Sequence, residues 1–224
     1  MPLAAAAVLD RLGRPGDIRL GTPPRGGQPL LSTGIGDLDS ALGGGIPRGR
    51  VTEVAGRRSS GRTGFACAVA AHATRRGEIV GWVDPADALD PETLFTTGIA
   101  PTRVLWVRPR TGHDAPRAAE LLLAAGGFGL VVLDLAEAAP HLRIPWPRLA
   151  RAAEQSRTTF LVLTPERRAG PYAALGLELG IRHTRWNRGP GRPAMLDGIA
   201  AALTVARHRL GVPGRTLTLR HACA

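Results

Sequence analysis

Lysine is absent from this chain: all 29 of its side chains of the lysine–arginine type are arginines. Set against 18 acidic side chains, they give a formal net charge of +11. A coding bias toward GC-rich codons explains the choice of arginine over lysine, and it also explains the abundance of alanine, glycine and proline. It does not explain the excess of positive charge, which favours nucleic acid or an acidic protein surface as a partner.

Long apolar runs and paired cysteines are missing as well. No stretch approaches the roughly 18 apolar residues of a membrane span, and the first residues lack the basic and apolar regions of a signal peptide. The two cysteines, Cys67 and Cys223, form no framework, and the histidines show no metal-ligand spacing. We therefore expect a soluble, cytoplasmic protein without a bound metal.

Residues 56–63, Gly-Arg-Arg-Ser-Ser-Gly-Arg-Thr, have the spacing of the phosphate-binding loop G-x-x-x-x-G-K-[ST]. In that loop, backbone N–H groups surround a phosphate at a helix N-terminus, the lysine reaches the outer phosphates, and the hydroxyl holds Mg²⁺. Arg62 stands where the lysine belongs; its guanidinium keeps the charge but is planar and bulkier. The sequence thus predicts a degenerate nucleotide-binding loop made by Gly56, Ser59, Ser60, Gly61, Arg62 and Thr63.

The rest of the chain alternates between short apolar runs and helical patterns. Strands are predicted at residues 51–55, 79–83, 104–107, 129–133 and 159–163, and helices at residues 91–97, 114–125 and 148–155. Continuous apolar strands separated by helices predict a parallel sheet that is covered on both faces. After Tyr172 the apolar residues alternate with polar ones, which predicts antiparallel strands at one edge.

Two units are expected along the chain. Residues 1–30 are predicted to hold a short N-terminal helix, at residues 2–12, and a linker rich in glycine, proline and arginine. Residues 31–224 are predicted to form a single core domain. At its start, residues 31–42 have the pattern of a capped helix that the glycines at 43–45 end.

Several segments together resemble RecA, the recombinase, over residues 12 to 220. Residues 31–50 are similar to the segment that enters the RecA core, and residues 83–91 to the segment after its second strand. Asp134, at the end of an apolar strand, has the place of the Walker B aspartate. The resemblance implies an α/β fold with a RecA-like P-loop core: a mainly parallel twisted sheet, helices on both faces, and antiparallel edge strands.

The departures from the RecA pattern lie along the path of ATP hydrolysis. The glutamate that activates water in RecA is matched by Ala86, the ring that stacks on adenine by Thr93, and the glutamine that senses the γ-phosphate by Pro165. Loss of a general base alone costs about 10²–10⁴-fold in rate. We therefore expect no catalysis and no required cofactor, although Thr63 and Asp134 are compatible with weak binding of ATP and Mg²⁺.

A short RecA-like chain with degenerate motifs is similar to the ImuA family. Its members are induced in the SOS response and act beside ImuB, an inactive Y-family polymerase relative, and an error-prone DnaE-type polymerase. The resemblance implies a non-catalytic accessory role in translesion DNA synthesis, with an ImuB-type protein as partner and RecA as a second candidate. Two alternatives stay open: an active DNA-dependent ATPase, with Glu53, Glu92 or Asp87 as base, and a SulA-type cell-division inhibitor.

The most concentrated basic stretch lies near the end of the chain. It carries four arginines and a tryptophan without an acidic residue: Arg182, Arg185, Trp186, Arg188 and Arg192. One interpretation is DNA binding, with arginines on phosphates and the indole stacked on a base. The other is an edge strand whose charges prevent unwanted pairing, with Trp186 covering the sheet.

Overall fold

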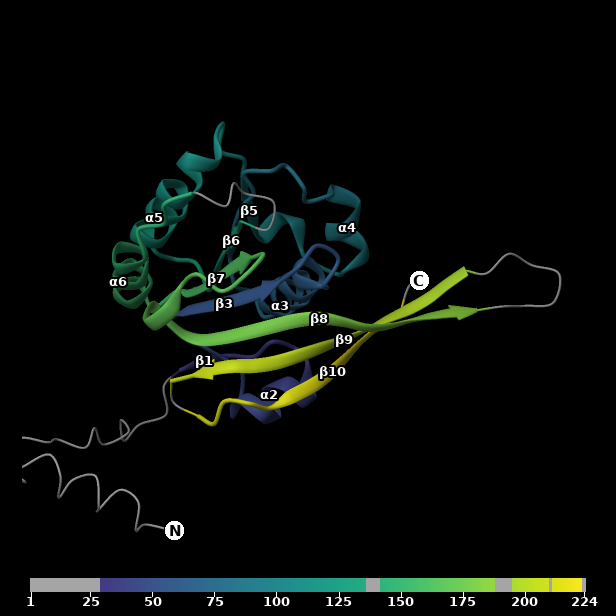
Figure 1. Ribbon diagram of the computed structural model, residues 1–224. Coiled ribbons are helices and arrows are strands. Elements are labelled where there is room, and N and C mark those ends of the chain that lie inside the picture. The colour runs from purple at the N-terminus through teal and green to yellow at the C-terminus, as the bar shows by residue number, and fades with distance from the viewer. Residues whose placement is uncertain (1–28, 136–141, 188–194, 210, 223–224) are drawn as a thin grey trace, which may run out of the picture.

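The structure is a computed structural model that describes residues 29–135, 142–187, 195–209 and 211–222 (Figure 1). The helix predicted at residues 2–12 and most of the linker after it lie outside the described residues. None of the described helices is long and apolar enough to cross a bilayer.

An eight-stranded sheet forms the centre of the molecule, in the order β10-β9-β8-β3-β7-β6-β4-β5. The strands from β8 to β5 in that order run parallel, whereas β9 and β10 are antiparallel to their neighbours. The predicted mainly parallel sheet with antiparallel edge strands is confirmed. The strands are β3 (Val51–Gly56), β4 (Val80–Val83), β5 (Val104–Val107), β6 (Leu130–Asp134), β7 (Thr159–Thr164), β8 (Ala173–Asn187), β9 (Met195–His208) and β10 (Thr216–Ala222).

Helices cover both faces of this sheet, as the continuous apolar strands predict. On one face α2 (Gly36–Leu42), α3 (Arg62–Arg75) and α4 (Pro91–Thr96) pack in a cluster around Phe65 and Trp82. On the other face α5 (Ala115–Ala125) and α6 (Trp146–Ser156) pack around Phe160 (Figure 1). Short elements complete the fold: β1 (Leu30–Leu31), β2 (Ile46–Pro47) and the 3₁₀ turns η1 (Pro101–Arg103), η2 (Gly112–Asp114) and η3 (Gly170–Tyr172).

The helix predicted over residues 31–42 is wrong in its first half. Leu30 and Leu31 form the short strand β1, and α2 begins only at Gly36. The cause is Asp39, whose carboxylate accepts hydrogen bonds from the Ser32 hydroxyl at 2.6 Å and from the Thr33 N–H and hydroxyl at 2.8 and 2.7 Å. Gly34, at φ +77°, turns the chain against His72. These side-chain bonds replace the first helical turn.

β8 is longer than its neighbour β3 and extends beyond it. Its pairing with β3 ends at Gly56 and Leu179, while its pairing with β9 continues to Asn187. β8 and β9, with β10 along the outer edge of β9, therefore run past the end of the central sheet as a projecting ribbon (Figure 1). This ribbon carries the described part of the basic stretch.

The Asp39 hydrogen bonds are expected to stabilise the entry to the core. Replacing Asp39 by alanine leaves the N–H and hydroxyl of fully buried Thr33 without these acceptors. We expect the free energy of unfolding to fall by about 2 kcal/mol in urea denaturation. Asp37→Ala is the matched control: Asp37 is exposed in the first turn of α2, and only a helix-dipole contribution below about 1 kcal/mol is lost. Equal effects would contradict the assignment.

Candidate functional site

The phosphate-type loop joins β3 to α3 with the turns that its glycines and serines require. Gly61 precedes the helix at φ +94°, and Ser59 adopts φ +61°. Gly56 has no room for a side chain, because a Cβ there would lie 2.5 Å from the Leu179 carbonyl oxygen. The Ser60 N–H donates to the Arg57 carbonyl at 3.0 Å. The loop thus leads from the end of β3 to the N-terminus of a 14-residue helix.

Arg62 is directed into the protein. It is the first residue of α3, it is only 5% exposed, and its Nη1 donates to the carbonyl oxygen of Thr164 at 2.7 Å. Thr164 is the last residue of β7, which lies between β3 and β6 in the sheet, and it is followed by Pro165. A phosphate-binding lysine has to present its charge to the ligand. Here the charged group instead ties the start of α3 to the carboxyl end of a neighbouring strand.

Thr63 and Asp134 keep positions that a Mg²⁺ site would use. Thr63 is exposed at the N-terminus of α3, and Asp134 is the buried last residue of β6. Cys67 lies one turn after Thr63 on α3. Burial, and to a smaller extent the negative charge of Asp134, raises the pKa of the Cys67 thiol to about 12. Asp134 therefore faces the first turns of α3. No cluster of three or more metal-ligating side chains occurs among the described residues.

The three acidic candidates for a general base are either bonded to other groups or exposed on the surface. Glu53 is 1% exposed on β3, and its Oε1 accepts hydrogen bonds from the N–H groups of Arg168 and Ala169 at 2.7 and 3.0 Å. Asp87 lies on the surface, 3.4 Å from the guanidinium of Arg108. Glu92 is exposed in the first turn of α4. The Glu53 carboxylate thus serves to hold the segment after β7.

The residues at the positions of RecA's water-activating glutamate, adenine-stacking ring and phosphate-sensing glutamine cannot take over those roles. Ala86 is exposed in a turn that the Asp84 carboxylate organises by accepting the N–H groups of Ala88 and Leu89. Thr93 lies on α4, and Pro165 follows β7 directly. None of these three residues carries a carboxylate or an amide side chain. The loop therefore retains the shape of a nucleotide site, but the residues around it do not fit the outer phosphates of ATP.

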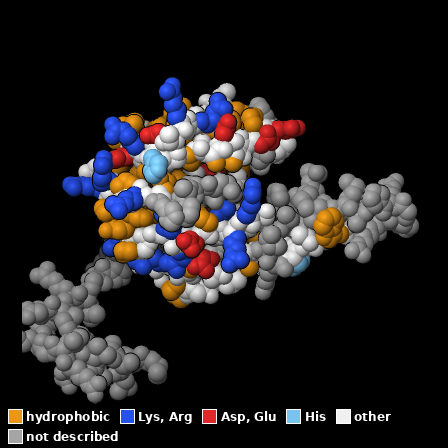
Figure 2. Space-filling model, turned by 45° about the horizontal axis from the view of Figure 1, so that its top comes forward, with side chains coloured by type: hydrophobic (Ala, Val, Ile, Leu, Met, Phe, Trp, Pro, Cys, Tyr) orange, Lys and Arg blue, Asp and Glu red, His pale blue; other side chains and the backbone are white. Residues whose placement is uncertain are grey.

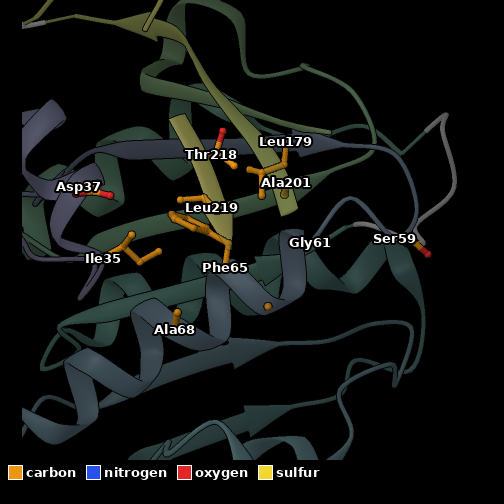
Figure 3. A pocket seen from close by; sticks show the side chains of 11 residues that line it. Ile35, Asp37, Ser59, Gly61, Phe65, Ala68, Leu179, Ala201, Thr218 and Leu219 are labelled. Atoms are coloured by element: carbon orange, nitrogen blue, oxygen red, sulfur yellow. The ribbon is translucent and has the colours of Figure 1, made fainter. Parts of the chain in front are cut away.

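Two hollows lie beside the loop. A groove of about 640 Å³ runs along α3 toward the entry segment; Figure 3 shows the Phe65 and Leu219 side chains pointing toward one another across it, with Gly61 at one end and Ile35 near the other. A second cavity of about 520 Å³ is lined by other residues of the loop and by the segment that follows β7. Sequence reasoning missed both. Arg57, Arg58, Ser60, Pro165, Glu166, Arg167, Glu178 and Gly180 line the second cavity.

The predicted DNA-binding residues lie apart from the loop, on the projecting ribbon. Trp186 is 51% exposed on β8, and its Nε1 donates to the Thr184 hydroxyl at 3.0 Å. The ring of Trp186 is thus about half covered on the ribbon, and the two interpretations of the basic stretch, DNA binding and a charged edge strand, stay predictions. Arg182 and Arg185 lie on the same strand, whereas Arg188 and Arg192 fall outside the described residues. The strand β8 links the surroundings of the loop to the ribbon. Gly180 lines the second cavity, and the strand continues from there to Arg182 and Arg185.

Comparisons with known proteins agree with this fold. The sequence profile of the RecA N-terminal domain matches residues 3–145. RecA of Salinispora tropica is 39% identical over 135 residues, 60% of this chain, and RecA of Thermus thermophilus is 38% identical over 132 residues, 58% of this chain. These matches span 39% of the length of each RecA.

A solved structure extends the similarity beyond that region. The crystal structure of the RadB recombinase has the same fold, with a TM-score of 0.64 and 23% identity, over 85% of this chain and 96% of the RadB chain. At that identity the likeness concerns the fold, which hosts different functions in different proteins. Because the profile match covers more than half of the sequence, the chain belongs to the RecA N-terminal domain family.

Proposed function

We propose that this chain is a RecA-like accessory protein without ATPase activity. The observation that carries the proposal is the hydrogen bond from the buried Arg62 guanidinium to the Thr164 carbonyl. A cation held in this way is not aimed at the outer phosphates, where charge develops during phosphoryl transfer. The family's phosphate loop is then retained as a part of the fold.

Three further positions support the same conclusion. Ala86, Thr93 and Pro165 have none of the groups that would activate water, stack on a base or sense a phosphate, and the nearby acid Glu53 is bonded to backbone N–H groups. Each of these groups contributes separately to phosphoryl transfer, through acid–base chemistry, positioning or charge stabilisation. Their joint absence favours a binding function over turnover.

The accessory role that we propose is in SOS-induced, error-prone translesion DNA synthesis. Its support is the family membership combined with degenerate catalytic positions, the pattern that resembles ImuA. The partner would be an ImuB-type inactive polymerase homologue, and RecA is the second candidate. The whole RecA-like surface would then serve for docking, while a net charge of +11 favours acidic partners or DNA.

The two alternatives make different demands on the same residues. An active ATPase of the RecA-paralogue class would need Arg62 to leave Thr164 and an acid such as Asp87 to leave Arg108. A SulA-type division inhibitor needs no phosphate loop, so the preserved turns at Ser59 and Gly61 count against it. Both alternatives are decided by the measurements that follow.

The first measurement is steady-state ATP hydrolysis with and without single-stranded DNA. We expect turnover no faster than background, because the general base and the phosphate-directed cation are both missing. Thr63→Ala, which removes the Mg²⁺ hydroxyl, should leave that background unchanged. DNA-stimulated turnover near 1 s⁻¹ or above, at the low end of typical enzymes, and its loss in Thr63→Ala would overturn the proposal.

A structural role for Arg62 can be separated from a ligand-binding role by stability. Arg62→Met keeps the aliphatic length but removes the donor to the buried Thr164 carbonyl, so the free energy of unfolding should fall by about 1.5–3 kcal/mol. Arg57→Met, at an exposed position of the same loop, should change it by less than about 0.5 kcal/mol. A neutral or stabilising effect of Arg62→Met would instead indicate an arginine held ready for a ligand.

Partner choice is tested by capture with purified proteins. An ImuB-type protein should be retained on the immobilised chain, and a tubulin-like division protein should not. RecA, offered as a nucleotide-bound filament on DNA, tests the second candidate. Retention of the division protein alone would favour the SulA-type alternative and contradict the translesion role.

A further inference from the structure

The ribbon has an open backbone edge. β8 loses its partner β3 after the pair Gly56–Leu179, and from Gly180 to Asn187 it pairs only with β9. Among the described residues no strand lies along the other edge of this segment. The far side of the ribbon is different, because β10 covers β9 as far as the pair Ala222–Gly198. An edge of this kind presents unpaired N–H and C=O groups that can pair with another chain.

The edge begins at the second cavity. β3 and β8 part at Gly56 and Gly180, and both residues line this hollow of about 520 Å³. Gly180 is exposed, and a Cβ built on it meets no atom within 4 Å, so the face of the strand is sterically open there. Ser60 lines the same cavity; the residue is 3% exposed, and its buried Oγ has no hydrogen-bond partner among the described residues. A strand added along β8 would thus begin at a hollow whose wall holds an unpaired hydroxyl.

Charge indicates the kind of strand that fits. Between Glu178 and Asp197 the sequence contains no acidic residue, and it includes Arg182 and Arg185 on β8 itself. The cavity adds three arginines, Arg57, Arg58 and Arg167, against two glutamates, Glu166 and Glu178. Arg167 lies 3.6 Å from the exposed Glu178. Figure 2 shows arginine side chains spread over the face of the core that is turned forward, with a few acidic side chains among them. Trp186 provides a half-exposed ring on β8.

We propose that the open edge of β8, from Gly180 to Asn187, binds an extended acidic segment of a partner protein by β-strand addition, with one end of that segment in the cavity beside Ser60. Main-chain hydrogen bonds would supply affinity, and the arginines and Trp186 would supply selectivity. Positive charges along an edge disfavour pairing with apolar or basic strands, and the same charges attract an acidic strand. This inference goes beyond the proposed function and does not depend on the absence of ATP turnover.

The test uses the full chain and fluorescein-labelled decapeptides in fluorescence anisotropy at physiological salt. The probes are a peptide of alternating glutamate and valine, its lysine–valine counterpart, and the glutamate–valine peptide with every second amide N-methylated. We expect the first to bind at least about tenfold more tightly than either of the others. Equal binding of the N-methylated peptide would show simple charge attraction and overturn strand addition.

Two variants locate the binding. Gly180→Glu places a negative charge at the start of the edge, where its Cβ has space, and should weaken the acidic peptide at least about tenfold. Gly112→Glu makes the same change at another glycine with open space, and should leave the affinity within about twofold. Circular dichroism and the melting temperature check that both fold. Equal affinities of the two variants, or displacement of the peptide by low concentrations of oligothymidylate, would overturn the proposal, the latter in favour of nucleic acid.

Discussion

The hydrogen bond from Arg62 to the Thr164 carbonyl fastens the start of α3 to the carboxyl end of the central sheet. It joins the first residue of α3, the helix that follows β3 and the loop, to the last residue of the neighbouring strand β7. On β3 itself, the Glu53 carboxylate holds the backbone of Arg168 and Ala169. A buried cation within the phosphate-type loop and a buried anion just before it in the sequence are thus both bonded to backbone groups.

In this arrangement the fold does not depend on nucleotide binding. The phosphate-type loop and the strand β6 lie within the residues that the RecA N-terminal domain profile matches, and the fold likeness to RadB extends over 85% of the chain. Stability of the fold requires apolar burial and satisfied backbone groups, and neither needs a nucleotide. Surfaces away from the loop are then free to carry function, and the unpaired length of β8 is the part where the ribbon departs from the enclosed sheet.

Sequence reasoning reached the fold because its signals are local. Runs such as Leu-Val-Val-Leu before Asp134 can be buried on both sides only in a covered parallel sheet. It failed over residues 31–35, where the Asp39 side chain competes with the helix from several residues away. It could not foresee that Arg62 bonds to Thr164, 102 positions along the chain, or that β8 outruns β3. Glu53, an acidic residue inside an apolar strand, is the sequence feature that indicates a buried carboxylate bonded to backbone groups.

Calorimetric titration of the unmodified chain with a non-hydrolysable ATP analogue and Mg²⁺ measures whether the loop still binds the outer phosphates of ATP. With Arg62 held by Thr164, we expect a Kd of about 1 mM or weaker, since only backbone groups, Thr63 and Asp134 remain to contact the ligand. Binding in the low micromolar range that depends on Arg62 and Mg²⁺ would contradict this expectation.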